Sequence, residues 1–168
     1  LKEVVQYYDD FLIHTTRQEN IPCQSETMTI NLVHGLPTES KNLMDSDQLK
    51  MTDHAHKYKN CWSFIDWFKA MYGGNVFRIA IVLIPPDKQV YPHIDFGEYY
   101  ANKDRFHLVL SGGYDLTVDN EMHRLDVGDF FWFNNKKMHS VKNATPMPRL
   151  AMILDVKGSL WRNKFDNM

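Results

Sequence analysis

The sequence predicts a mainly β domain with flanking helices, folded as an antiparallel double-stranded β-helix, or jelly roll. From residue 76 onward, apolar and polar residues alternate with the period of two that is typical of strands. Short segments rich in Gly, Pro, Asn and Asp separate the alternating runs. Eight short strands with little helix between them indicate a closed antiparallel barrel of the cupin-like type.

The predicted strands cover residues 76–84, 89–95, 105–110, 114–118, 122–125, 130–133, 139–143 and 150–156. In a barrel of this kind the second and seventh strands lie face to face. We therefore expect His93, Asp95 and His139 to meet at one mouth of the barrel.

The N-terminal part has a different pattern. Apolar residues at helical spacing predict an amphipathic helix over residues 2–14, and alternation predicts a half-buried strand over 28–35. Residues 35–53 are polar and predict a loop or a short helix. An aromatic stripe over 62–72 predicts a second helix that ends at Gly73, because glycine can take the left-handed cap conformation.

The length and composition suit one domain, 1–168, with an ordinary hydrophobic content of 43% and a charged content of 24%. Within it we expect residues 1–75 to support the core, residues 76–156 to form a jelly-roll catalytic core, and residues 157–168 to form a C-terminal tail.

The formal net charge of −2 gives no sign of a nucleic-acid partner. Cys23 and Cys61 are too few for a disulfide framework or a zinc site, so a reducing, cytoplasmic location is expected. No apolar run has transmembrane length and the start lacks a signal-peptide pattern, so no membrane association is expected. The oligomeric state stays open.

Metal-binding chemistry is suggested by His93-Ile94-Asp95. Residues at i and i+2 of a strand point to one face, so a nitrogen and an oxygen can approach the same point. His139 from another strand would complete two histidines and one carboxylate, the facial triad of non-haem Fe(II) oxygenases. His54 and His56 repeat the spacing, but their polar surroundings favour surface histidines.

Arg149 opens the last hydrophobic run of the sequence. An arginine at the head of a buried strand needs an anionic partner, because an unpaired buried charge is costly. A dicarboxylate co-substrate would supply that partner.

Residues 76–156 resemble the aspartyl/asparaginyl β-hydroxylase-like family of Fe(II)- and 2-oxoglutarate-dependent dioxygenases. The matching features are His93-Ile94-Asp95, Arg105-Phe106-His107, the Gly128-Asp129 turn, Phe133-Asn134-Asn135, His139-Ser140-Val141 and Arg149. The resemblance implies an enzyme that hydroxylates an unactivated C–H bond of an amino-acid-like small molecule or a protein side chain. It also implies Fe(II), 2-oxoglutarate and O2 as reactants, and succinate and CO2 as co-products.

The resemblance further implies roles for single residues. His93, Asp95 and His139 would be the iron ligands. Arg149 would bind the distal carboxylate of 2-oxoglutarate, with Arg105 and His107 close to that co-substrate.

Substrate residues are less clearly indicated. Where the family commonly has an acidic pair, this chain has Asn134-Asn135, which puts the substrate in doubt. Aromatic and polar side chains near the predicted mouth are candidates for holding a small-molecule or peptide substrate, and the loop 96–104 is a candidate lid. These candidates are Tyr91, Phe96, Tyr99, Tyr100, Trp132 and Asn134.

Two other functions stay open at this point. Gly128, His139 and Asn143 have the spacing of the second cupin motif, which suggests a cupin-type metal-binding protein or isomerase without 2-oxoglutarate chemistry. The first cupin motif, H-x-H followed by a glutamate, fails because Asp95 stands in place of the second histidine and Glu98 follows too closely. Such a protein also has no need of Arg149. A metal-free binding module on the same barrel is the third possibility.

Overall fold

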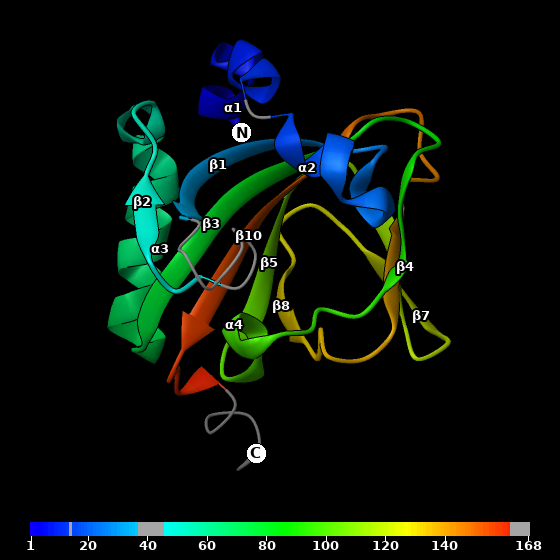
Figure 1. Ribbon diagram of the computed structural model, residues 1–168. Coiled ribbons are helices and arrows are strands. Elements are labelled where there is room, and N and C mark those ends of the chain that lie inside the picture. The colour runs from blue at the N-terminus through cyan, green and yellow to red at the C-terminus, as the bar shows by residue number, and fades with distance from the viewer. Residues whose placement is uncertain (14, 37–45, 162–168) are drawn as a thin grey trace.

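The computed structural model describes residues 1–13, 15–36 and 46–161 (Figure 1). The strands are β1 (Met28–Gly35), β2 (Leu49–Met51), β3 (Asn75–Ile84), β4 (Gln89–His93), β5 (Asp104–Ser111), β6 (Tyr114–Val118), β7 (Glu121–Leu125), β8 (Phe130–Phe133), β9 (His139–Lys142) and β10 (Arg149–Lys157). The helical segments are α1 (Lys2–Gln6), η1 (Tyr8–Leu12), α2 (Thr16–Asn20), η2 (Pro22–Gln24), η3 (Ala55–Lys57), α3 (Lys59–Tyr72) and α4 (Glu98–Ala101).

Two antiparallel sheets form the barrel. The larger sheet has the strand order β2-β1-β3-β10-β5-β8, and the smaller has the order β4-β9-β6-β7. The fold is therefore the mainly β, cupin-like jelly roll that the alternating pattern predicts. Residues from the N-terminal part enter it directly, because β1 pairs with β3 in the larger sheet and with β2, which forms the edge of that sheet.

The larger sheet is covered on both faces. Ile79, Ile81 and Leu83 of β3 pack in the core that includes α3, whereas Ala80 and Val82 belong to the second core, inside the barrel. Figure 1 shows α3 against one face of this sheet and the smaller sheet on its other side. A strand buried on both faces is apolar throughout, so each polar residue on the inner face needs an explanation.

The helix α3 is confirmed. It ends at Gly73, whose φ of 64° is the positive value that glycine adopts readily. On the sheet side, Phe68 contacts the rings of Phe106 and Phe130 at centroid distances of 5.1 and 5.7 Å. The aromatic stripe therefore belongs to the core.

The predicted continuous helix over 2–14 is wrong. The chain forms α1 and then the 3-10 turn η1, and of its apolar residues Val4 and Phe11 are buried while Leu12 is exposed. A tertiary contact explains the difference: the buried carboxylate of Asp10 accepts hydrogen bonds from Tyr58 Oη at 2.8 Å and Lys57 Nζ at 3.1 Å.

Two further expectations need correction. The stretch predicted as a loop or short helix over 35–53 contains the strand β2, and residues 37–45 lie outside the described ones. His54 is buried with its ring against Tyr58, whereas His56 is exposed as expected. Within the described residues, no helix is long and apolar enough to cross a lipid bilayer.

Candidate metal centre and its cavity

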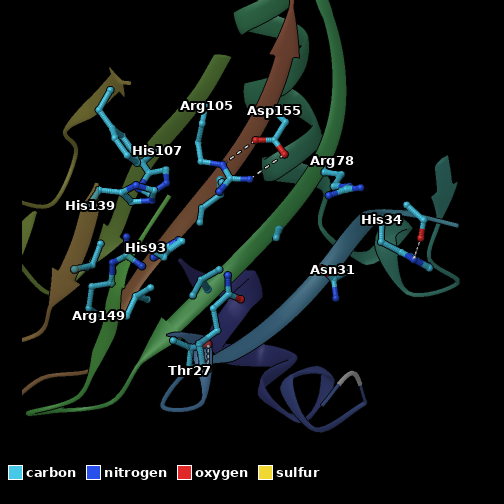
Figure 2. A pocket seen from close by; sticks show the side chains of 18 residues that line it. Thr27, Asn31, His34, Arg78, His93, Arg105, His107, His139, Arg149 and Asp155 are labelled. Carbon is cyan, nitrogen blue, oxygen red and sulfur yellow. Dashed lines mark hydrogen bonds and ion pairs between the residues drawn. The ribbon is translucent and has the colours of Figure 1, made fainter. Parts of the chain in front are cut away.

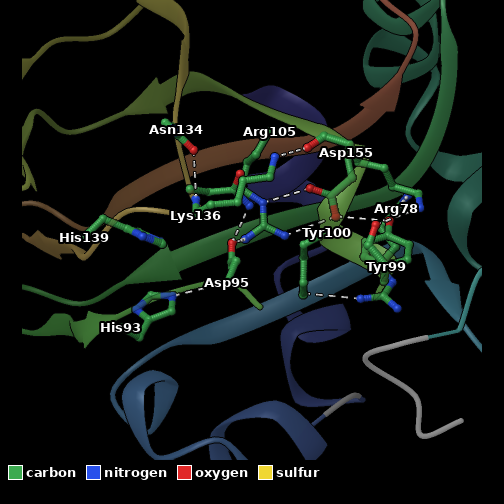
Figure 3. Close-up of polar contacts among 12 residues, drawn as sticks. Arg78, His93, Asp95, Tyr99, Tyr100, Arg105, Asn134, Lys136, His139 and Asp155 are labelled. Carbon is green, nitrogen blue, oxygen red and sulfur yellow. Dashed lines mark hydrogen bonds and ion pairs between the residues drawn. The ribbon is translucent and has the colours of Figure 1, made fainter. Parts of the chain in front are cut away.

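His93, Asp95 and His139 come together as a compact set of donor atoms. One nitrogen or oxygen from each lies within 4.8 Å of the others. β4 and β9 place His93 directly opposite His139, with ring centroids 4.2 Å apart, and Asp95 Oδ1 lies 3.7 Å from His93 Nε2. Figure 3 shows the three side chains facing one another. Two imidazoles and one carboxylate are the donors of a facial triad.

The backbone fixes which nitrogen of each imidazole is available. His93 Nδ1 lies 2.8 Å from the carbonyl oxygen of Tyr91, and His139 Nδ1 lies 2.9 Å from that of Lys137. A carbonyl only accepts hydrogen bonds, so each Nδ1 carries the proton and each Nε2 carries a lone pair. Burial also lowers the pKa of His139 to about 4, which keeps its ring neutral near neutral pH.

Asp95 lies just beyond the end of β4, although the sequence predicts a strand through residue 95. Its backbone N–H donates to the carbonyl of Asn135 at 3.0 Å, and its Oδ2 accepts from Asn135 Nδ2 at 2.8 Å and from Arg105 Nη1. Burial by itself raises the pKa of Asp95, but Arg105 and Asn135 outweigh burial and hold this pKa below its ordinary value. Asp95 is therefore an oriented carboxylate with Oδ1 towards the histidines.

Arg105 is held between two carboxylates (Figure 3). Its Nε and Nη2 donate to Asp155 Oδ1 and Oδ2 at 2.8 and 3.1 Å, opposite the Asp95 contact. Arg105 and Asp155 are direct cross-strand neighbours, and Tyr99 Oη also donates to Asp155 at 3.1 Å. Although burial alone would lower the pKa of Arg105, Asp155 and Asp95 raise it well above the ordinary value. The sequence prediction missed the role of Asp155.

Arg149, the first residue of β10, is 1% exposed. Its guanidinium lies 4.0 Å from the centroid of the Tyr114 ring. Within the described part of the chain, Nε and Nη2 of Arg149 and Nε2 of the buried His107 have no hydrogen-bond partner. Burial, followed by the charge of Arg149, lowers the pKa of His107 well below its ordinary value, so this ring is neutral. Buried polar groups without a partner need an explanation, and a ligand in contact with them would supply one.

A cavity of about 170 Å³ connects these groups (Figure 2). His93, His139, Arg105, His107, Arg149 and Asp155 are among its lining residues. Apolar walls come from Val82, Val90, Phe133, Val141 and Ile153. The cavity thus joins the candidate metal ligands to the cation of Arg149.

The substrate candidates from the sequence lie elsewhere. Trp132 Nε1 donates to Asp104, and Trp132 lines a separate cavity of about 360 Å³ beside β6 to β8. Asn134 accepts a hydrogen bond from the backbone N–H of Lys136, and neither Asn134 nor Tyr91 lines the cavity of the triad.

The segment 96–104, a candidate lid in the sequence, contains the short helix α4. Its Phe96 is 84% exposed, whereas Tyr99 and Tyr100 are buried next to Arg105. These tyrosines are therefore part of the wall behind the cavity.

A family model described as aspartyl/asparaginyl beta-hydroxylase matches residues 40–158. A search of curated protein sequences found no match.

Similar solved structures include three bacterial proteins. A conserved protein of unknown function from Streptococcus pyogenes is 18% identical with a TM-score of 0.39, over 48% of this chain and 63% of that chain. A predicted oxalate decarboxylase from Thermotoga maritima is 10% identical with a TM-score of 0.46, over 78% and 80%. A cupin protein from Bacteroides fragilis is 21% identical with a TM-score of 0.42, over 48% and 65%. The chain thus spans less than two thirds of the streptococcal and Bacteroides proteins.

Proposed function

Because the chain belongs to the aspartyl/asparaginyl beta-hydroxylase family, we propose that it is an Fe(II)- and 2-oxoglutarate-dependent dioxygenase. It hydroxylates an unactivated C–H bond of an amino-acid-like small molecule or of a protein side chain. The observation that carries the proposal is one cavity lined both by the triad histidines and by a buried arginine with two unpartnered nitrogens.

The donor set fits Fe(II). His93 and His139 would each bind through Nε2, because Nδ1 is used by a backbone carbonyl, and Asp95 would bind through Oδ1. The metal and 2-oxoglutarate would supply, when bound, the oxidising chemistry with O2 that yields succinate and CO2 as co-products. The protein contributes fixed ligand orientations, which normally matter as much as the identity of the ligands.

Arg149 fits the distal carboxylate of 2-oxoglutarate. A guanidinium offers parallel N–H donors that match the two oxygens of a carboxylate, and two nitrogens of Arg149 have no partner within the described residues. His107 can donate or accept one further hydrogen bond through Nε2. The apolar side chains Val82, Val141 and Phe133 exclude water from this end of the cavity, which strengthens the ion pair.

The cupin alternative relied on the spacing of Asn143 behind His139. In the structure Asn143 is buried, and its Nδ2 donates to the carbonyls of Ile84, Pro85 and Met147 at 3.0, 3.1 and 2.8 Å. These hydrogen bonds connect two loops, so Asn143 has a structural role that does not require a bound ligand. The dioxygenase proposal accounts for Arg149 as well.

The proposal is tested by anaerobic visible absorption of the protein with Fe(II), adding 2-oxoglutarate last. We expect a charge-transfer band that requires both additions, that disappears in His139→Ala, and that weakens in Arg149→Met at limiting co-substrate. Arg124→Met, which changes an exposed pair with Asp115, is the matched control and should retain the band. Absence of the band in the folded wild-type protein would refute the dioxygenase assignment.

A further inference from the structure

Asn31 is a polar residue on the inner face of the barrel. It lies directly opposite Ala80 of β3, which belongs to the core inside the barrel, whereas the preceding Ile30 packs in the core that includes α3. Residues opposite each other in an antiparallel pair point to the same face of the sheet. The side chain of Asn31 therefore points into the barrel, where it lines the cavity of the triad and is half-buried. A polar side chain in this position needs an explanation.

A β-bulge sets the direction of this side chain. The pairing of β1 with β3 shifts between Asn31 and Val33, so Leu32 is the extra residue of β1. Thr52 Oγ1 donates to the carbonyl oxygens of Asn31 and Leu32 at 2.8 and 3.3 Å. Bulges often re-aim a side chain next to an active site. Here the backbone is fixed through its carbonyls, and the side-chain amide of Asn31 is left for other contacts.

The side-chain amide of Asn31 has no hydrogen-bond partner among the described residues 1–13, 15–36 and 46–161. Two other polar residues on the cavity wall differ, because the fold already uses their donors. Thr27 Oγ1 donates to a backbone carbonyl at 2.9 Å. Arg78 donates from Nη1 to Tyr100 Oη at 3.3 Å and from Nη2 to the carbonyl of Ser46 at 3.2 Å. Asn31 thus offers hydrogen-bonding capacity that these contacts leave unused.

One row of directly opposed residues links Asn31 to the other end of the cavity. From β1 to β5 the row consists of Asn31, Ala80, Ile153 and His107. Neighbouring strands are about 4.8 Å apart, so the backbones of Asn31 and His107 are separated by roughly 14 Å. Figure 2 shows Asn31 on one side of the cavity and His107 on the other, the side of Arg149. Under the proposed function 2-oxoglutarate occupies the His107 side, and the Asn31 side stays available for the substrate.

We infer that the Asn31 side of the cavity is the substrate site, and that Asn31 recognises a neutral group that both donates and accepts hydrogen bonds. A hydroxyl and an amide are such groups, and either can pair with both Nδ2 and Oδ1 of Asn31. A carboxylate can only accept and an ammonium can only donate, so each would leave one atom of the Asn31 amide unpaired. The substrate role rests on the proposed function, but binding at Asn31 needs neither metal nor 2-oxoglutarate.

The test is an NMR titration of the metal-free protein with probes of similar shape. Propanamide and n-propanol are neutral donors and acceptors, whereas propionate only accepts and propylammonium only donates. Selectivity is measured at the side-chain amide of Asn31, and affinity in the variants at the methyl groups of Ile153, which lines the cavity. The variants are Asn31→Ala and, as a matched control, Asn60→Ala, because Asn60 is exposed on α3. Thermal unfolding verifies that each protein is folded.

We expect a neutral probe to shift the Asn31 amide and the two charged probes to leave it unshifted. The relative affinities of propanamide and n-propanol distinguish an amide from a hydroxyl. Asn31→Ala should weaken binding of the neutral probe about 3–10-fold, the factor that corresponds to the net loss of one hydrogen bond, and Asn60→Ala should retain it. The inference is overturned if neither neutral probe binds, if a charged probe shifts the Asn31 amide at lower concentration, or if folded Asn31→Ala binds as the wild type does.

A second measurement connects this site to the triad. In the wild type with Mn(II) and 2-oxoglutarate, the protons of the neutral probe should relax faster than with Mg(II), because Mn(II) is paramagnetic. Displacement of the probe by 2-oxoglutarate, or unchanged relaxation in a protein that binds Mn(II), would overturn the substrate site. A protein that binds the probe at Asn31 but gives no charge-transfer band with Fe(II) would instead refute only the proposed function.

Discussion

Replacing Arg149 by methionine should stabilise the protein without ligands and abolish its stabilisation by 2-oxoglutarate. Methionine keeps an unbranched apolar side chain, but it removes the guanidinium together with its charge, its contact with the Tyr114 ring and the two unpartnered nitrogens. The two effects have opposite signs because the same guanidinium is unfavourable when it is buried alone and favourable when it binds a carboxylate.

The magnitudes can be derived from these contacts. A buried polar group without a partner costs about 1–3 kcal/mol. Loss of the cation–π contact with Tyr114 takes back about 0.5–2 kcal/mol. For the two unpartnered nitrogens the net gain is about 0–5.5 kcal/mol. We expect Arg149→Met to stabilise the ligand-free protein by about 1–4 kcal/mol, the range found when buried ions are replaced by apolar residues. At about 2–4 °C per kcal/mol for a chain of this size, the Tm should rise by several degrees.

The assay is thermal and urea unfolding of both proteins, first with a chelator and then with Mn(II) and 2-oxoglutarate. Mn(II) replaces Fe(II) because it does not start turnover in air. Co-substrate at a hundred times its Kd should stabilise the wild type by about 2.7 kcal/mol and the variant by nearly nothing. The reasoning is refuted if the ligand-free variant is less stable than the wild type, or if 2-oxoglutarate stabilises both proteins equally.

Three further predictions concern the surroundings of the triad. Asp155→Asn should weaken Mn(II) binding, because Arg105 then orients Asp95 less firmly. The expected loss is about 10–100-fold, as is typical when a group that orients a metal ligand is removed. An unchanged Mn(II) affinity in a dye-competition titration would contradict this. The pKa of His139 is lowered to about 4 by burial, and that of an unfolded histidine is about 6.5. The unfolded chain therefore binds a proton that the folded chain excludes, so the free energy of unfolding should fall as the pH drops from about 6.5 towards 4. Urea unfolding measured across that range should be flatter in His139→Gln. Phe68→Ala should destabilise the fold by about 3–5 kcal/mol and leave the Mn(II) affinity of the folded protein unchanged, and a large loss of affinity would show that the helix layer also shapes the site.

The barrel could be predicted from the sequence because its strands leave a strong pattern. β3 and β10 are buried on both faces and read as continuous apolar runs, while turns with Gly and Pro separate them from their neighbours. The first helix could not be predicted correctly, because the buried carboxylate of Asp10 accepts hydrogen bonds from Lys57 and Tyr58. These partners lie far from Asp10 in the sequence, so no local pattern reveals them.

The convergence of the candidate ligands was predicted, but its cause was not. His93 and Asp95 were expected on one strand, yet Asp95 leaves β4 and is oriented by Asn135 and Arg105. These contacts depend on which loops and strands become neighbours, and the sequence gives no direct signal for that. The assignment of metal and co-substrate roles to these residues stays a prediction.

Arg78 and Asp155 were missed for a related reason. Both are polar residues within apolar strands, and both point to the inner face, as do their neighbours two residues away. A search for polar residues at every second position of each predicted strand would have found them. Their separate contacts depend on tertiary structure. Asp155 lies opposite Arg105 on the neighbouring strand, and the guanidinium of Arg78 stacks on the Tyr99 ring.

The central position of β10 also limits how relatives of this protein can diverge. Arg149 and Asp155 lie on the same face of this one strand, and both of its edges are paired, with β3 and with β5. One inserted or deleted residue between them would turn one of the two side chains to the opposite face of the sheet. During evolution, changes in length can accumulate in the loops around the barrel, but the segment from Arg149 to Asp155 must keep its number of residues if both side chains are to stay in the cavity.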